Sequence, residues 1–204
     1  LDYARLVYGA FVQDLWRNGT TRSILFGTIH KESTLVLMEL LQKTGLSAYV
    51  GKVNMDRNSP DFLIEETSQS LADTKDWLEA SAQFGPLVKP IITPRFVPSC
   101  TSELMDGLGT LSEEYKVPVQ SHLSENHGEV DWVAALHPES PNYTDVYYEH
   151  KLIGRTPTVM AHCIHLSDVE MDRMAETQTM VSHCPYSNVN LSSGIALIRK
   201  LMKR

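Results

Sequence analysis

The feature that most constrains the fold of this chain is an alternation of strand and helix patterns along its length. Short apolar runs typical of buried strands recur, and each precedes a segment whose apolar residues are spaced for one helical face. The predicted strands are Ser23–His30, Ala48–Met55, Val88–Arg95, Val117–Leu123, Thr156–His162 and Thr179–Cys184. The predicted helices are Leu1–Asn18, Leu35–Lys43, Phe62–Phe84, Ser102–Tyr115, Glu125–His137 and Ser167–Thr177. This alternation indicates an α/β fold with a parallel sheet and crossover helices.

Two α/β architectures have this pattern, the doubly wound open sheet and the (β/α)8 TIM-type barrel. A barrel uses roughly 250 residues for eight units, and six units in 204 residues give a similar spacing. A doubly wound fold more often has a glycine-rich first turn. The nearest candidate, Gly107-Leu-Gly109, lacks the third glycine and follows a helix pattern. We therefore expect a single partial barrel domain, residues 1–204, that contains six of the eight units.

The composition excludes several classes of protein. The formal net charge is -7, which is unlike the basic surface of a nucleic-acid-binding protein. No apolar stretch approaches the roughly 20 residues of a membrane-spanning helix. The three cysteines are few, odd in number and widely separated, so no disulfide framework is expected. These features predict a cytoplasmic protein that acts on neither nucleic acid nor membrane.

Both ends of the chain are predicted to be internal positions of a longer protein. The first residue is Leu1 rather than Met, and it leads directly into a helix pattern. The last residues, Lys203 and Arg204, follow the start of another helix pattern.

Titratable side chains stand where two consecutive predicted strands end. His122 ends one strand, Glu125 follows it three residues later, and His162 ends the next strand. Neighbouring parallel strands lie about 4.8 Å apart, so the two imidazoles can reach one metal ion, with Zn–N distances of about 2.0–2.1 Å. A single strand-end histidine is more often a hydrogen-bonded structural residue. Two of them on consecutive strands, with a nearby Glu, favour a metal site.

The role of His183, near the last predicted strand, is open from its position alone. It could be a third ligand, or it could support the site or contact substrate from its periphery. Cys184 beside it has no partner at the C-x-x-C spacing, which argues against a zinc site of the cytidine-deaminase type.

Several segments together resemble the amidohydrolase superfamily of metal-dependent barrels and, within it, the guanine deaminase family. The matching segments are Phe26-Gly-Thr-Ile-His30, Val50–Asp56, Lys89-Pro-Ile-Ile-Thr-Pro-Arg-Phe96, Gln120-Ser-His-Leu-Ser-Glu-Asn126, Val159-Met-Ala-His162 and His183-Cys-Pro-Tyr-Ser-Asn188. They cover nearly the whole chain.

The resemblance implies a role for each matching residue. His122 and His162 would be ligands of one zinc ion on barrel strands five and six, and Glu125 would be the catalytic proton shuttle that also contacts substrate. Arg95, Phe96 and His122 would contact the purine, with Arg95 at its carbonyl oxygen, while His183 would be a nearby residue that supports the site without binding the metal. The family also has a His-x-His pair on strand one and an Asp on strand eight. This chain contains neither, so it is expected to hold strands two to seven only.

The activity implied by the resemblance is the zinc-dependent hydrolysis of guanine to xanthine and ammonia, in a homodimeric enzyme of purine catabolism. One alternative is a related deaminase or hydrolase that acts on another purine, a pterin or a triazine. A second alternative is a barrel remnant without activity. Residues 1–204 by themselves are expected to be inactive, because half of the zinc ligands lie outside them.

Overall fold

The computed structural model describes all residues, 1–204, and contains strands and helices in the predicted alternation. The strands are β1 (Arg22–Phe26), β2 (Ser47–Gly51), β3 (Val53–Asn54), β4 (Val88–Pro90), β5 (Thr93–Pro94), β6 (Val119–Leu123), β7 (Thr158–His162) and β8 (Met180–Ser182). The longer helices are α1 (Asp2–Arg17), α2 (Lys31–Thr44), α3 (Thr67–Ser81), α4 (Ser102–Tyr115), α5 (His127–Leu136), α6 (Tyr143–Glu149) and α7 (Asp168–Glu176). The short ones are η1 (Asp61–Leu63), η2 (Val97–Ser99), α8 (Pro185–Asn190) and α9 (Ile198–Leu201).

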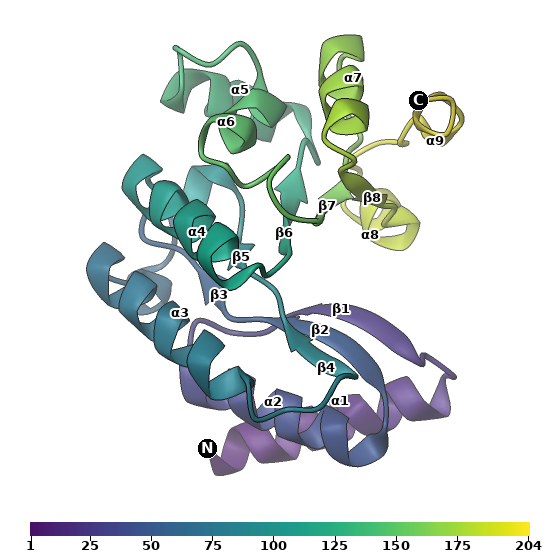
Figure 1. Ribbon diagram of the computed structural model, residues 1–204. Coiled ribbons are helices and arrows are strands. Elements are labelled where there is room, and N and C mark those ends of the chain that lie inside the picture. Colours follow the sequence, from purple (N-terminus) through teal and green to yellow (C-terminus); the bar gives the residue numbers. More distant parts are fainter.

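All strand pairs are parallel, and the strands follow one another in chain order (Figure 1). β1 pairs with β2, and β2 with β4. β3 pairs with β5, and β7 pairs with both β6 and β8. A parallel bridge between Ile92 and Val119 joins the two halves. Parallel strands in sequential order with a helix after each are the arrangement of a (β/α) barrel wall.

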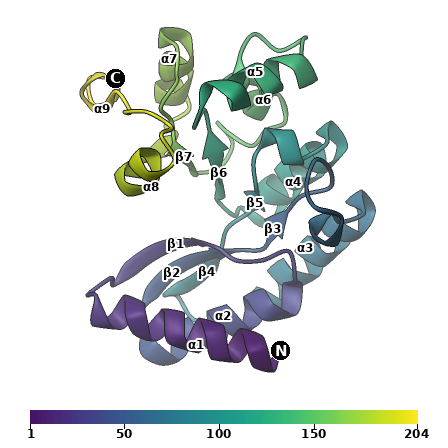
Figure 2. The same ribbon diagram turned by 180° about the vertical axis from the view of Figure 1, so that it is seen from behind.

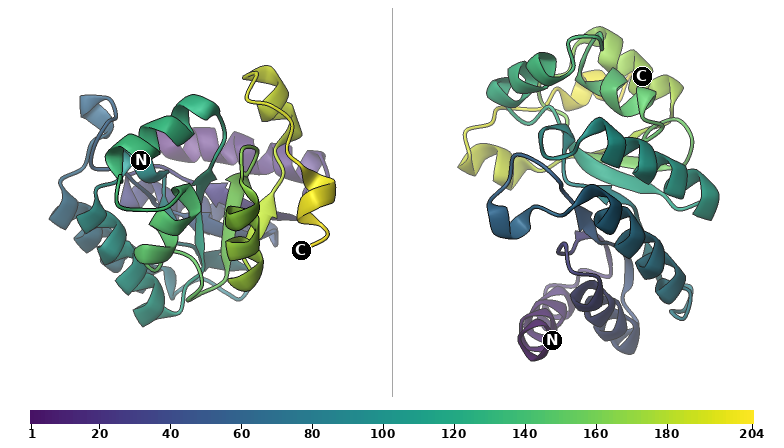
Figure 3. Two further views of the ribbon diagram at one scale, coloured as in Figure 1. Left: turned by 90° about the horizontal axis from the view of Figure 1, so that it is seen from above. Right: turned by 90° about the vertical axis from the view of Figure 1, so that its left-hand side faces the viewer.

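The helices lie on the outside of this curved sheet, and the main apolar core lies between the two layers. In Figures 1 and 2, α1 and α2 lie against β1, β2 and β4, while α5, α6 and α7 lie around β6, β7 and β8. Viewed from above, the helices are arranged around the strands (Figure 3). Buried side chains from every layer form one connected cluster, in which Trp77 on α3 and Leu41 on α2 are fully buried. None of the helices is long and apolar enough to cross a membrane.

Within residues 1–204 the sheet has two edges, because β1 and β8 do not pair with each other. Between them the concave face encloses a hollow of about 410 Å³ that is lined by residues of β1, β2, β6, β7 and β8. The order and direction of the strands therefore match the expected barrel wall, but these residues do not close a barrel.

Two predicted strands are each divided by a short irregular segment. The predicted strand Ala48–Met55 is broken at Lys52, between β2 and β3, and the strand Val88–Arg95 is broken at Ile91 and Ile92, between β4 and β5. Close packing accompanies the first break, since a Cβ on Gly51 would lie 1.8 Å from Thr93 Oγ1. Only glycine fits at this position.

The five helices predicted up to residue 137 are all present, but α2 begins at Lys31 rather than Leu35 and α3 at Thr67 rather than Phe62, and the later helices α6 and α8 were not predicted. The segment Phe62–Phe84 begins its α-helix only at Thr67, because Glu66 is the N-cap and accepts a hydrogen bond from the Gln69 amide. The seven-residue helix α6 was not predicted. It is too short for apolar periodicity to identify it.

Candidate functional site

Two histidines lie side by side where β6 and β7 end. His162 is the last residue of β7 and pairs in register with Leu123, the residue after His122. The ring centroids of His122 and His162 are 5.5 Å apart and the ring planes differ by 21°. The two side chains therefore lie together at one end of the sheet, as expected.

Left-handed backbone conformations turn the chain sharply after both strands. Ser124 has a φ of 50°, His162 of 72° and Cys163 of 52°. Such conformations are costly for residues other than glycine and are concentrated at functional sites. Here they are stabilised by hydrogen bonds between the two turns, from the Cys163 amide to Leu123 O and from the Ile164 amide to Ser124 O. The two strand ends are thereby held as one unit.

Each imidazole is oriented through its Nδ1 atom. His122 Nδ1 lies 2.6 Å from the Arg95 carbonyl oxygen, and His162 Nδ1 lies 2.8 Å from Asn188 Oδ1. Both partners are acceptors, so each ring carries its proton on Nδ1 and keeps the Nε2 lone pair for a ligand. Burial is the main factor that lowers the pKa of His122, which favours the neutral imidazole.

This donor arrangement fits a zinc ion, for which neutral imidazole nitrogen is a preferred ligand. The number of ligands is incomplete. No group of three or more His, Cys, Asp or Glu side chains in residues 1–204 is placed to hold a metal ion, whereas catalytic zinc sites usually have three protein ligands. This chain can therefore supply two.

Glu125 lies next to the histidine pair. Its Oε1 atom is 3.6 Å from His162 Nδ1 and accepts a 3.3 Å hydrogen bond from Ser193 Oγ. Its backbone amide donates to Glu129 Oε2, and Tyr143 donates a 2.7 Å hydrogen bond to the other oxygen of Glu129. The carboxylate of Glu125 forms no ion pair with a Lys or Arg side chain, and the imidazole that it approaches is that of His162.

A cavity of about 390 Å³ opens beside His122, a volume in the range of small-molecule sites. Arg95 and His122 are the polar, charge-bearing side chains of its wall, and Phe26, Met55 and Leu63 supply apolar surface. The Phe26 ring lies 4.6 Å from the His122 ring between centroids. An apolar cavity with one cation and one imidazole suits a flat, polar heterocycle.

Arg95 lines this cavity, and Phe96 lies against Arg95. The Arg95 guanidinium carbon is 5.0 Å from the centroid of the Phe96 ring, and Phe96 contacts Trp132 edge to face at 6.3 Å. Arg95 forms no ion pair with any carboxylate in the structure. Its N–H groups therefore remain available for a ligand.

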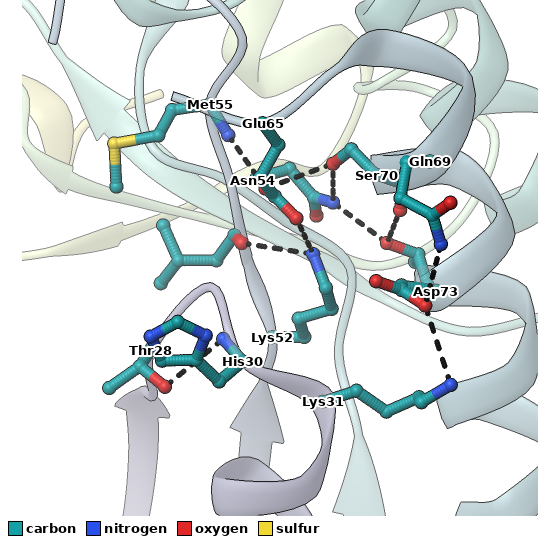
Figure 4. A network of polar contacts seen from close by, with 12 residues as sticks. Thr28, His30, Lys31, Lys52, Asn54, Met55, Glu65, Gln69, Ser70 and Asp73 are labelled. Carbon is teal, nitrogen blue, oxygen red and sulfur yellow. Dashed lines mark hydrogen bonds and ion pairs between the residues drawn. The ribbon is translucent and has the colours of Figure 1, made fainter. Parts of the chain in front are cut away.

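The cavity wall that carries Met55 and Leu63 is held by a buried ion pair. Lys52 has no exposed surface, and its Nζ atom donates a 2.6 Å hydrogen bond to Glu65 Oε1. Glu65 Oε2 accepts a further hydrogen bond from Ser70 Oγ, as Figure 4 shows. Burial lowers the pKa of Lys52, and the carboxylate of Glu65 opposes this change. The pair joins the segment between β3 and α3 to the strand break at Lys52.

Two polar residues near the end of the predicted second strand, Asn54 within it and Asp56 just after it, have structural partners. Asn54 is buried and contacts Ser70 and Thr74 on α3. Asp56 accepts hydrogen bonds from the backbone amide and the hydroxyl of Thr101 at the start of α4, and another from Thr67. The hydrogen bonds of these two residues connect strand to helix, so a polar side chain at a strand end can serve the fold.

His183 lies away from the pair formed by His122 and His162. It is exposed and lines a hollow between α7, β8 and α9, together with apolar side chains such as Met171 and Ile198. No hydrogen bond or ring contact joins it to either histidine. This position supports neither binding of a metal ion by His183 nor a contact between His183 and the two histidines. The role that the sequence suggested for His183 therefore stays a prediction.

Sequence reasoning did not single out Asn188 or Ser193, the residues that contact His162 and Glu125. Asn188 ends the segment His183–Asn188 that carried part of the family resemblance. The place of Asn188 in this segment was the one signal in the sequence that could have identified it.

Comparisons with a family model, with curated sequences and with solved structures all point to the same family. The model of the amidohydrolase family matches residues 1–204. The guanine deaminase of Dictyostelium discoideum is 48% identical over the whole chain. A crystal structure of guanine deaminase from C. acetobutylicum, with guanine bound in its active site, superposes with a TM-score of 0.97 at 52% identity and covers 99% of this chain.

The atrazine chlorohydrolase TrzN of Arthrobacter aurescens shares the fold, with a TM-score of 0.86 at 16% identity over 98% of this chain. The chain spans less than half of each of these proteins: 45% of the Dictyostelium enzyme, 48% of the C. acetobutylicum chain and 46% of TrzN.

Proposed function

Because the chain belongs to the amidohydrolase family, we propose that it forms strands two to seven of a guanine deaminase barrel, which converts guanine and water to xanthine and ammonia. The observation that carries this proposal is the cavity between Arg95 and His122, with His162 and Glu125 beside it. It is supported by 48% identity to a guanine deaminase and by the close superposition on a guanine-bound relative.

In this proposal His122 and His162 would hold one zinc ion through their Nε2 atoms. The other ligands would come from strands outside residues 1–204. The chemistry that such an ion supplies is a water molecule with its pKa lowered to about 7.

The residues of this chain would bind guanine and move its protons. Arg95 would donate hydrogen bonds to the carbonyl oxygen, because a guanidinium stays charged and presents several fixed N–H groups. Phe96, beneath the guanidinium, would pack beside the purine. Glu125 would accept a proton from the water that attacks the carbon bearing the exocyclic amine. It would deliver that proton to the adjacent ring nitrogen and then assist the amine to leave as ammonia.

The test is a measurement of ammonia release by the complete polypeptide that contains residues 1–204. The substrates are guanine, adenine, a pterin and an aminotriazine at equal concentrations. We expect guanine to have the highest kcat/KM, and we expect the change Arg95→Ala to reduce this preference. A higher kcat/KM for another heterocycle would replace guanine as the substrate, and no release from any of them would overturn the proposal.

A further inference from the structure

His162 has two oxygen atoms within reach of its Nδ1 proton. Asn188 Oδ1 lies at 2.8 Å and Glu125 Oε1 at 3.6 Å. The ring has one Nδ1 proton to donate, so the nearer oxygen takes it. A carboxylate is the stronger acceptor of the two, because hydrogen bonds to charged groups are roughly twice as strong as those to neutral ones. The imidazole would by itself prefer the carboxylate of Glu125, but the shorter distance directs its proton to Asn188.

Asn188 is held rigidly in this position. Its exposed fraction is 1%. Its backbone amide donates to Cys184 O, and its carbonyl oxygen accepts from the Ser193 amide. Its side-chain nitrogen is buried and has no hydrogen-bond partner in residues 1–204. An unpaired buried amide nitrogen is costly, which indicates that this side chain is kept for its oxygen rather than for stability.

The same short segment also restrains Glu125. Ser193, five residues after Asn188, donates its hydroxyl hydrogen bond to Glu125 Oε1. A backbone hydrogen bond from the Ser193 amide to Asn188 O holds these two residues together. It thereby fixes the distance between Asn188, the acceptor for His162, and Ser193, the donor to Glu125.

We propose that Asn188 is a positioning residue that takes the Nδ1 proton of His162 and so keeps Glu125 free for proton transfer. This inference rests on the proposed function, in which His162 binds zinc and Glu125 moves protons. Without Asn188, the imidazole would donate to Glu125. The carboxylate would then be held by the histidine, and the ring would lose the orientation that directs Nε2 to the metal.

The experiment compares Asn188→Ala, Asn188→Asp and the control Asn190→Ala in the complete polypeptide. Asn190 is the same residue type on the same helix, α8, and is exposed. Zinc affinity is measured by competition with a chelator, and the pH dependence of kcat is recorded at saturating zinc. Loss of a hydrogen-bonded partner of a metal-bound histidine typically costs about 10- to 100-fold in affinity. We expect this loss, and a shifted pH profile, for Asn188→Ala only. Asn188→Asp keeps an acceptor oxygen and should retain most of the affinity.

Two outcomes would overturn the inference. One is unchanged zinc affinity and an unchanged pH profile in Asn188→Ala. The other is an equal loss in Asn188→Asp and Asn188→Ala, which would mean that the amide nitrogen faces His162. If Asn188→Ala does not fold, ¹⁵N chemical shifts of the histidines in the unaltered protein decide, since the Nε2–H tautomer of His162 contradicts the inference. Zinc affinity and tautomer need no turnover, so failure of the guanine assay alone would count against the proposed function and not against this role.

Discussion

His122 and His162 lie on neighbouring parallel strands with their rings 5.5 Å apart and 21° from parallel, and each is oriented through Nδ1 by an oxygen atom. This relationship predicts that both rings bind one zinc ion. In the complete polypeptide, His122→Ala and His162→Ala should each weaken zinc binding by more than about 100-fold, the upper end of the effect of losing a ligand's own partner. Chelator competition measures this change.

The control for the zinc prediction is His150→Ala. His150 is bound to Asp106 rather than to the pair, so its removal should leave zinc affinity unchanged. Full zinc binding in His162→Ala would remove that residue from the site.

Glu125→Gln should preserve zinc and guanine binding but lower turnover by roughly 10²- to 10⁴-fold, the usual contribution of a positioned acid–base group. The amide keeps the size of the side chain and cannot accept the proton. Glu139→Gln, at an exposed carboxylate, is the matched control. Steady-state kinetics decide, and near-normal turnover of Glu125→Gln would assign proton transfer to another group.

Arg95→Ala should lower kcat/KM for guanine by about 1.5–3 kcal/mol, roughly 10- to 150-fold, because one hydrogen bond from a charged donor is lost. Little loss of stability is expected, since Arg95 is exposed and forms no ion pair. Arg155→Ala, at an exposed arginine of the loop before β7, provides the control. If guanine kinetics are the same in both variants, Arg95 does not contact substrate.

Lys52→Met should destabilise the fold by about 3–5 kcal/mol, because it leaves the largely buried Glu65 carboxylate without its cation. The double variant Lys52→Met/Glu65→Leu removes both charges and should recover most of that loss. Urea unfolding of the single and double variants measures the difference. A double variant no more stable than Lys52→Met would show that the pair contributes more than charge compensation.

Residues 1–204 expressed alone should be poorly soluble, bind zinc weakly and release no ammonia from guanine. β1 and β8 are unpaired on their outer sides, and open edges invite association with other chains. The two histidines also fall short of the usual three ligands. The assay is the loss of guanine with added zinc, and turnover at an ordinary enzymatic rate would contradict the prediction.

Elements that depend on neighbouring residues could be predicted from the sequence alone. The capping box formed by Ser167 and Glu170 marks the start of α7 as predicted. Helix α4 occupies the predicted range, Ser102–Tyr115. The ends of β6 at Leu123 and of β7 at His162 were also as predicted, whereas β1 ends at Phe26 and not at the predicted His30, which caps α2. In a parallel sheet the register then brings His122 and His162 together without further information.

Which polar residues contact the histidine pair could not be predicted in this way, because it depends on how distant segments pack. Asn54 and Asp56 also stand near a strand end, but their partners are Ser70 and Thr101, 16 and 45 positions away. Asn188 had no distinguishing local feature, yet it contacts His162 from 26 positions away. His183, which the family resemblance placed near the site, faces another hollow. The physical reason is that hydrogen bonds between distant segments depend on how the layers pack, and packing leaves no periodic pattern in the sequence.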